Sequence, residues 1–261
     1  MHHHHISETE KFYDVFCQRF VNDYVEKNDR IAAQKSLLKS AIHPATSSIL
    51  IVGCGSGETA YFLAQHTQAR ILAVDISSEA LKLAQHLFAH PRIEYRQVDV
   101  INEPLEGRRS VIFFPDVYEH IPAASRANLH AALDRLLSEN GQIILTVPSS
   151  LKQEHLRANG GLQIVDEVIT LDTLLELAND VHGMLTYFNL ISVWDSGDYI
   201  HAIVERRPNS LVALSQNDLV PLRSHVPLSF AGKVIDFTAQ RTKARQVWRG
   251  LKRKLLAKRV N

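Results

Sequence analysis

The feature that most constrains this chain lies at residues 48–60, where a short apolar run passes through three glycines into a helical pattern. The apolar residues 49–52 predict a buried parallel strand, and the residues beyond the glycines predict a helix. The glycines stand at 53, 55 and 57, and they suit a tight turn in which a ligand approaches bare backbone. The free N–H groups at the start of the helix favour a polar or anionic ligand above that turn.

The spacing of these glycines separates two classes of nucleotide ligand. A dinucleotide fingerprint is G-x-G-x-x-G, and its third glycine would fall at position 58, which is Glu58. The spacing therefore disfavours a nicotinamide dinucleotide. A tight turn that binds no cofactor is the structural alternative at this point.

Two further predicted strands end on an acid. The apolar strand predicted at 70–74 ends at Asp75, and the strand predicted at 93–98 ends at Asp99. The carboxyl ends of parallel strands meet at one edge of a sheet, where a carboxylate can accept both hydroxyl protons of a ribose. The alternative for Asp75 is that it only caps the next helix, for which Ser77 is also a good N-cap.

Taken in order, the glycine turn and the two acids resemble the class I S-adenosylmethionine-dependent methyltransferases over residues 45–206. The resemblance implies a Rossmann-like sheet of seven strands with an antiparallel last strand. It also implies S-adenosylmethionine as cofactor and S-adenosylhomocysteine as product, with Asp99 at the adenine amino group and Val100 against the ring. The cofactor residues expected within the sheet domain are Gly53, Cys54, Gly55, Gly57, Asp75, Ile76, Asp99, Val100, Pro115 and Asp116.

Residues 115–122 follow a predicted strand at 110–114 and resemble the family segment that contains a Glu-His pair. The resemblance implies that Pro115 and Asp116 flank the methionine part of the cofactor, while Glu119 and His120 face the acceptor. A histidine suits the removal of a hydroxyl proton near neutral pH, so His120 is the first candidate for a catalytic base. The competing interpretation, in which the Glu-His pair only supports the cofactor loop, stays open.

An N-terminal helical segment is predicted at 8–40 from the spacing of its aromatic and aliphatic residues. In the family such a segment covers the cofactor, so Tyr13, Tyr24 and Arg30 are expected to reach the ligand. The alternative is an amphipathic helix that packs on the sheet edge. Tyr13 and Arg30 complete the predicted cofactor set.

The second half of the domain is expected to supply the acceptor pocket. Residues 148–169 show no regular pattern and are predicted to form a functional loop. Its polar candidates include His155, which is the second choice for a base. Around it the sequence predicts a helix at 125–137 closed by Asn140-Gly141, a strand at 142–147, a helix at 171–178 and a hairpin of 185–194 with 198–205.

The predicted domains are a tag remnant and lid at 1–44, the methyltransferase domain at 45–206, and an extension at 207–261. Residues 241–259 hold nine Lys or Arg and no acid, which leaves 20 basic residues against 28 acids elsewhere. An acidic body disfavours nucleic acid as a partner. The basic amphipathic helix predicted at 241–260 suits an anionic membrane surface or an acidic partner, or else it packs on its own domain.

No apolar run reaches the roughly 18 residues of a membrane span, and no secretory hydrophobic region is evident. Two cysteines, Cys17 and Cys54, do not suggest a disulfide framework. A cytoplasmic protein is therefore expected, with peripheral contact to the inner membrane face as an option through the basic segment.

The reaction expected is O-methylation of a sugar, a glycan or another small-molecule hydroxyl. N-methylation of a small amine is one alternative, and a non-catalytic cofactor-binding or interaction module is another. No Asp-Asp or Asp-Asn pair follows the fifth predicted strand, so no metal is predicted in the site. Residues 114–118 lack the Asn/Asp-Pro-Pro-aromatic signature of enzymes that methylate nucleic-acid bases or glutamine amides.

Overall fold

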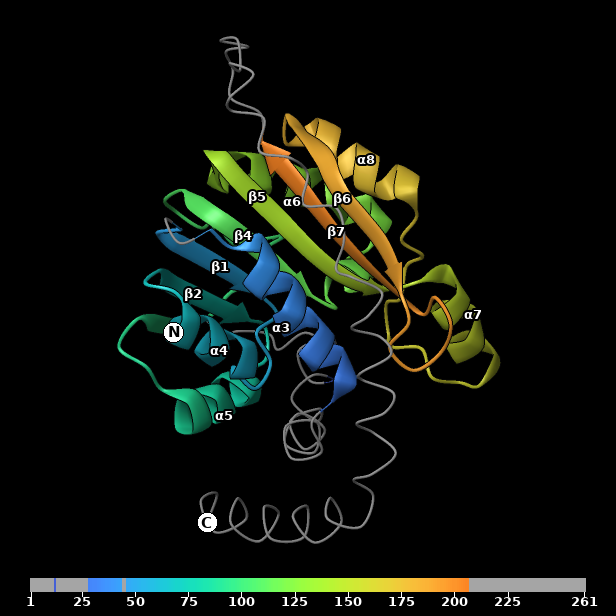
Figure 1. The fold of residues 1–261 in the computed structure, drawn as a ribbon, viewed down its shortest axis with the longest axis horizontal. Helices are drawn as coiled ribbons and strands as arrows, with labels where there is room; N and C mark the ends of the chain where they lie inside the picture. Colours follow the sequence, from blue (N-terminus) through green and yellow to red (C-terminus); the bar gives the residue numbers. More distant parts are fainter. Residues whose placement is uncertain (1–11, 13–27, 44–45, 207–261) are drawn as a thin grey trace, which may run out of the picture. The chain divides into compact units, whose positions relative to one another are not determined.

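The computed structural model describes residues 12, 28–43 and 46–206 (Figure 1). Seven strands form one sheet in the order β3-β2-β1-β4-β5-β7-β6. The strands are β1 Ser48–Val52, β2 Arg70–Asp75, β3 Ile93–Gln97, β4 Arg109–Pro115, β5 Leu137–Pro148, β6 Gly183–Ile191 and β7 Tyr199–Arg206. The helices are α3 Asp29–Ala41, α4 Glu58–His66, α5 Ser78–Phe88, α6 Arg126–Leu136, α7 Ser150–Ala158 and α8 Leu171–Asp180, with short 3₁₀ turns η1 Tyr118–His120 and η2 Ala123–Ser125.

The five strands from β3 to β5 pair in parallel, whereas β7 is antiparallel to both β5 and β6. The Rossmann-like sheet predicted for residues 45–206, including its single antiparallel strand, is confirmed. The strand order reverses between β1 and β4, and open α/β sheets bind ligands outside the carboxyl ends of the strands at such a switch point.

Two apolar cores cover the two faces of the sheet. Side chains alternate along a strand, so Ile49 and Ile51 of β1 enter the core with α3, α4 and α5, whereas Leu50 and Val52 enter the core with α6 and α8. The helices of each core lie on the same side of the sheet in Figure 1. Burial of both faces explains why β1 is a continuous apolar run rather than an alternating one.

The structure corrects the predicted loop at 148–169, because residues 150–158 form α7. Ser149 caps this helix, since its hydroxyl accepts from the backbone N–H of Lys152 at 3.3 Å and donates to the carbonyl of Gly197 at 2.6 Å. Only Gln153 of α7 is buried. A helix with so little apolar surface leaves no hydrophobic periodicity in the sequence, and that is why the prediction failed.

The predicted role of Asn140-Gly141 as a helix end is also wrong, because α6 ends at Leu136 and both residues lie in β5. A Cβ on Gly141 would lie 2.7 Å from a methyl of Leu137 and 3.0 Å from the carbonyl oxygen of Arg109. This glycine therefore permits a close approach of two strands, and it does not have the positive φ of a helix-ending glycine.

The predicted helix at 8–40 is confirmed at its end, where α3 begins after Asn28, whose side chain accepts from the backbone N–H of Arg30 at 2.9 Å. Tyr13, Tyr24 and the whole segment 207–261 lie outside the described residues, so the lid contacts and the basic helix at 241–260 remain predictions. Within the described ranges, no helix has the length and hydrophobicity that crossing a membrane requires.

Gly57 and Gly160 provide a matched pair of stability predictions. Both have positive φ, 80° and 69°, but a Cβ on Gly57 would lie 2.6 Å from the hydroxyl of Tyr95 and 2.9 Å from Ala84, whereas one on Gly160 would contact nothing within 4 Å. Gly57→Ala should therefore destabilise the fold by about 2–4 kcal/mol, and Gly160→Ala by about 1 kcal/mol from backbone strain alone. Denaturant unfolding measures both. Equal losses would show that packing behind the glycine turn does not matter.

Candidate functional site

The glycine turn joins β1 to α4 with three residues in the left-handed region, at φ values of 73° for Gly53, 52° for Gly55 and 80° for Gly57. The backbone N–H groups of Gly53 and Cys54 donate to the carbonyl of Val74 in β2, at 2.8 and 2.9 Å. Only glycine fits at the first position, because a Cβ there would lie 2.2 Å from a methyl of Val117. The turn thus presents bare backbone at the end of β1.

Asp75 lies at the end of β2 beside this turn. One carboxylate oxygen accepts from the backbone N–H of Gly55 at 2.9 Å, and the other accepts from that of Ser77 at 3.0 Å. The N-cap of α5 is Ser77, whose hydroxyl accepts from the N–H of Ala80 at 3.1 Å. Asp75 is therefore not the N-cap residue. A carboxylate is an acceptor with about four lone-pair sites, the kind of group to which the hydroxyls of a ribose can donate.

Asp99 follows β3 in the same row of strand ends. Its carboxylate accepts from the backbone N–H of Ile101 at 3.0 Å and from the side chain of Asn102 at 2.7 Å. Val98 and Val100 line the cavity beside it. An acid next to apolar surface offers one hydrogen-bonding edge and one flat contact, as a nucleobase requires.

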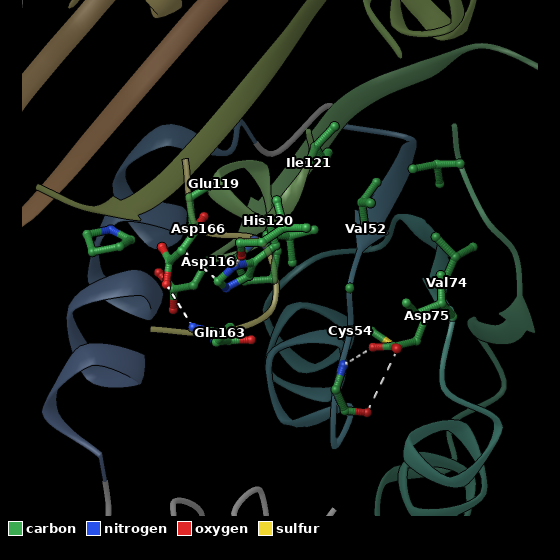
Figure 2. Close-up of a pocket in the computed structure, with 18 of the residues that line it drawn as sticks. Val52, Cys54, Val74, Asp75, Asp116, Glu119, His120, Ile121, Gln163 and Asp166 are labelled. Atoms are coloured by element: carbon green, nitrogen blue, oxygen red, sulfur yellow. Dashed lines mark hydrogen bonds and ion pairs between the residues drawn. The ribbon is translucent and has the colours of Figure 1, made fainter. Parts of the chain in front are cut away.

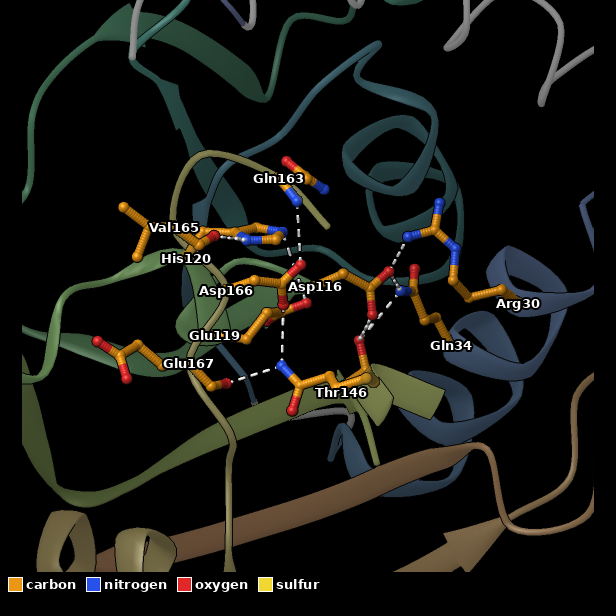
Figure 3. Close-up of polar contacts among 11 residues, drawn as sticks. Arg30, Gln34, Asp116, Glu119, His120, Thr146, Gln163, Val165, Asp166 and Glu167 are labelled. Atoms are coloured by element: carbon orange, nitrogen blue, oxygen red, sulfur yellow. Dashed lines mark hydrogen bonds and ion pairs between the residues drawn. The ribbon is translucent and has the colours of Figure 1, made fainter. Parts of the chain in front are cut away.

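Asp116 lies one residue beyond β4 and has a positive φ of 53°, which is uncommon for a residue other than glycine. Its carboxylate forms an ion pair with Arg30, accepts from the side chain of Gln34 at 2.8 Å and accepts from the hydroxyl of Thr146 at 3.3 Å (Figure 3). Burial raises the pKa of Asp116 above its ordinary value, and the charge of Arg30 opposes that rise. Helix α3 is thereby fixed to the end of β4.

Glu119 in η1 is only 1% exposed and lines the cavity. Its Oε1 lies 3.7 Å from Nε2 of His120, and among the described residues its Oε2 has no hydrogen-bond partner. Burial, reinforced by the charge of Asp116, raises the pKa of Glu119 well above its ordinary value. A buried acceptor of this kind is costly unless a ligand supplies a donor.

His120 stands beside Glu119 and donates a hydrogen bond to the backbone. Its Nδ1 lies 2.8 Å from the carbonyl oxygen of Val165, and a carbonyl can only accept, so Nδ1 carries a proton (Figure 3). Burial lowers the pKa of His120 below its ordinary value, which favours the neutral ring near pH 7. In the neutral ring the lone pair is on Nε2, the nitrogen that faces Glu119.

These side chains line one cavity of about 840 Å³ (Figure 2). Small-molecule sites typically have about 300–1,000 Å³, so the cavity has room for a nucleoside cofactor together with a small acceptor. In Figure 2, Asp75 and Cys54 lie at one end, and Asp116, Glu119, His120 and Asp166 lie at the other. The predicted site residues that line it are Arg30, Gly53, Cys54, Gly55, Asp75, Ile76, Asp99, Val100, Pro115, Asp116, Glu119 and His120.

Two described residues of the predicted set do not line this cavity. Gly57 packs behind the turn against Tyr95 and Ala84. His155 is exposed on α7, where the cavity-lining residues are Lys152 and Leu156. The structure therefore does not bring His155 together with the other candidates.

Some of the residues that line the cavity were not predicted from the sequence. Gln34 contacts Asp116 across 82 positions, and Trp194 and Tyr199 come from the hairpin of β6 and β7. No local pattern marks them, because each joins the site only through the sheet topology. Within the described part of the chain, no group of three or more His, Cys, Asp or Glu side chains is arranged to hold a metal ion.

Comparison with known proteins agrees with this geometry. Residues 49–141 match the family model of a methyltransferase domain. No curated protein sequence matches this chain. Among solved structures, a TehB-like S-adenosylmethionine-dependent methyltransferase from Corynebacterium glutamicum has a TM-score of 0.56 at 18% identity, covering 76% of this chain and 99% of that one.

Two further solved structures share the fold. The complex of DhpI with S-adenosylhomocysteine has a TM-score of 0.61 at 16% identity, covering 78% of this chain and 98% of that one. Magnesium protoporphyrin IX methyltransferase from Synechocystis, with bound S-adenosylhomocysteine, has a TM-score of 0.55 at 20% identity, covering 70% and 84%. At such low identities these likenesses establish the fold.

The residues present fit the cofactor that the fold implies. The cavity has the required volume, the turn at Gly53 has no room for a side chain, and Asp75 and Asp99 stand at adjacent strand ends. From the family match, the fold and this fit together, we conclude that the chain carries an S-adenosylmethionine-dependent methyltransferase domain.

Proposed function

We propose that this methyltransferase acts on a hydroxyl of a small polar acceptor, a sugar or a related polyol. The cofactor would lie over the strand ends, with Asp75 at the ribose hydroxyls, Asp99 and Val100 at the adenine, and Pro115 and Asp116 beside the methionine part. When bound, S-adenosylmethionine supplies an electrophilic methyl group. Removal of the acceptor proton would be carried out by residues at the end of the cavity that contains Glu119 and His120.

The observation that carries the proposal is the state of His120. A hydroxyl must lose its proton as the new C–O bond forms, and a neutral imidazole can take it. The carbonyl of Val165 holds the Nδ1 proton, so Nε2 is the nitrogen that receives the acceptor proton. Oε1 of Glu119, at 3.7 Å from Nε2, then faces the imidazolium that results. The proton therefore moves from acceptor oxygen to His120 while both groups stay buried.

The lining around His120 suits a ligand rich in hydrogen-bond donors. Oε2 of Glu119 and Oε1 of Gln163 are buried acceptors that have no partner among the described residues. Hydroxyl groups would satisfy both. Trp194 adds a flat apolar surface at the same cavity, which the C–H face of a sugar ring can cover. The carboxylate of Asp166, which accepts from the side chain of Gln153 at 2.9 Å, lies at this end of the cavity and disfavours an acceptor that carries a phosphate or carboxylate.

The acids at this end of the cavity favour one second candidate, N-methylation of a small amine. A cationic amine would form an ion pair with Glu119, whose Oε2 has no hydrogen-bond partner among the described residues. An amine needs to lose its proton before it can react, and it does not need a base during bond formation. The two candidates therefore differ in their dependence on His120.

A panel of matched acceptors tests the proposal. Methyl glycosides of a hexose, an aminohexose and a hexuronic acid, with simple primary amines, are incubated with the enzyme and S-adenosylmethionine, and release of S-adenosylhomocysteine is measured. Methyl ether formation on the neutral hexose, lost in His120→Ala, is the expected result. Turnover confined to amines, or preferred turnover of the uronic acid, would overturn the hydroxyl assignment.

A further inference from the structure

Behind η1, the turn that contains Glu119 and His120, three polar side chains form a chain of hydrogen bonds that runs from the interior to Asp180, whose side chain is 44% exposed. The hydroxyl of Tyr118 lies 2.6 Å from Nε2 of His130, and Nδ1 of His130 lies 2.6 Å from a carboxylate oxygen of Asp180. Tyr118 is fully buried and His130 is 1% exposed. These residues come from η1, α6 and the end of α8, and none of them lines the cavity. We call them the Tyr118–His130–Asp180 chain.

The donors along this chain run in one direction. Burial raises the pKa of Tyr118 above its ordinary value, and the charges of Glu176 and Asp180 add to that effect against Arg126. The phenol therefore keeps its proton and donates to Nε2 of His130. The proton of His130 then lies on Nδ1 and donates to Asp180, because a carboxylate accepts. Each bond fixes the next, as in other polar networks inside proteins.

Arg126 adds a second contact to the same tyrosine. Its guanidinium lies 5.4 Å from the centre of the Tyr118 ring, a cation–π distance, and the residue is only 9% exposed. The imidazole of His130 lies parallel to the ring of Tyr118, with an interplanar angle of 6°. The orientation of Tyr118 is therefore set by the hydrogen bond of its hydroxyl and by the cation over its ring.

The residues that follow Tyr118 in the chain are Glu119 and His120. This turn is held on its other side by the segment at 165–167, through the bond of His120 to Val165 and a 2.8 Å bond from the N–H of Glu167 to the carbonyl of Glu119. Backbone bonds from His120 to Val117 at 2.9 Å and from Ile121 to Tyr118 at 3.3 Å close the turn itself. The turn that contains Glu119 and His120 is therefore fixed on two sides. The segment at 165–167 holds one side, and Tyr118 holds the side toward the protein interior.

We propose that His130 is a positioning residue, which acts through Tyr118 to hold His120 at its depth in the cavity. The inference rests on the proposed function, since it concerns the base assigned there. Burial is the main reason why the pKa of His120 is low, so this pKa reports how deeply the ring sits. Loss of the Tyr118–His130 bond should let the turn move outward and expose His120 to water.

The first test is Tyr118→Phe, which removes one hydroxyl and keeps the packed ring. Titration of the histidine ring signals by NMR in the full-length protein should show the pKa of His120 rising toward its ordinary value, because the ring becomes more exposed to water. His201 in β7 is an internal reference, because burial lowers its pKa to about 4 independently of this turn. An unchanged His120 titration in a folded variant would overturn the proposal.

The second test removes the same bond from the other side, with His130→Asn. It should raise the pKa of His120 as Tyr118→Phe does, and the double variant should equal either single one, because all three lack the same bond. His182→Ala is the control, since His182 contacts Asp134 at 3.1 Å on the exposed surface. Additive shifts in the double variant would contradict a shared path through Tyr118.

Kinetics separate this inference from the proposed function. Tyr118→Phe should lower kcat by about 10- to 100-fold, while affinity for S-adenosylhomocysteine stays within about twofold, because misplacement of a catalytic group costs rate and not cofactor binding. If His120→Ala retains full activity, the proposed base is wrong, although the NMR result on positioning still stands. If His120→Ala is inactive and Tyr118→Phe is fully active, only the positioning role is wrong.

Discussion

Asp75→Asn should weaken binding of S-adenosylhomocysteine by about 100-fold in a calorimetric titration. A hydrogen bond to a charged group contributes about 1.5–3 kcal/mol, and the isosteric amide keeps the acceptor for one ribose hydroxyl while losing the other. One such bond corresponds to roughly 10- to 150-fold in affinity. Asp75→Ala, which removes both acceptors, should bind more weakly still.

The control for this prediction must account for the structural bonds of Asp75. Its carboxylate also accepts from the N–H groups of Gly55 and Ser77, so thermal unfolding of the variant shows whether the turn is intact. Glu94→Gln is the matched acid, since Glu94 lies on exposed β3 next to Arg96 and outside the cavity. Undiminished binding by a folded Asp75→Asn protein would remove Asp75 from the cofactor site.

His120→Ala should lower the rate of methyl transfer by about 10²- to 10⁴-fold, the usual contribution of a positioned general base. Affinity for S-adenosylhomocysteine should stay nearly unchanged, because His120 lies at the end of the cavity opposite Asp75 (Figure 2). His155→Ala is the matched control, since that histidine is exposed on α7 and should not affect the rate. A collapse of cofactor affinity in His120→Ala would instead assign His120 a structural role.

The pH dependence of the wild-type rate follows from the same residue. The neutral form of His120 is the base, and burial lowers its pKa, so kcat should be constant through neutral pH and fall only at acid pH. The stability of the fold should change with pH in the same direction as the rate. The unfolded chain binds a proton at this histidine near pH 6.5 while the folded chain resists it, so stability falls as the pH drops below that value. A rate that increases toward acid pH would contradict the assignment.

The sequence predicts those parts of the site whose determinants are neighbours in the chain. The apolar strand, the glycines at 53 and 55 and the start of α4 lie within a few residues of each other, and local sterics decide the turn. The N-cap Ser77 is local in the same sense, and the order of strands ending in Gly53, Asp75 and Asp99 follows from parallel topology. For this reason the fold and the row of strand-end residues are where the sequence predicts them.

The opposite end of the cavity depends on contacts that no local pattern encodes. Arg30 reaches Asp116 across 86 positions, and His130 reaches Asp180 across 50. From the sequence, Arg30 and Asp116 are expected as separate ligand contacts, and their ion pair is not predicted. His155 is expected in an acceptor loop because α7 lacks an apolar face. Contacts between side chains that are far apart in the sequence could therefore be identified only from the structure.

In the complex that we propose, the cofactor lies across the carboxyl ends of β1 to β4 with its reacting group toward His120. The decisive measurement is a crystal structure of the protein with S-adenosylhomocysteine. We expect ribose hydroxyls within about 3 Å of the Asp75 carboxylate and a sulfur atom that faces the part of the cavity lined by Glu119 and His120. A nucleoside bound elsewhere, or a sulfur directed away from His120, would overturn this arrangement.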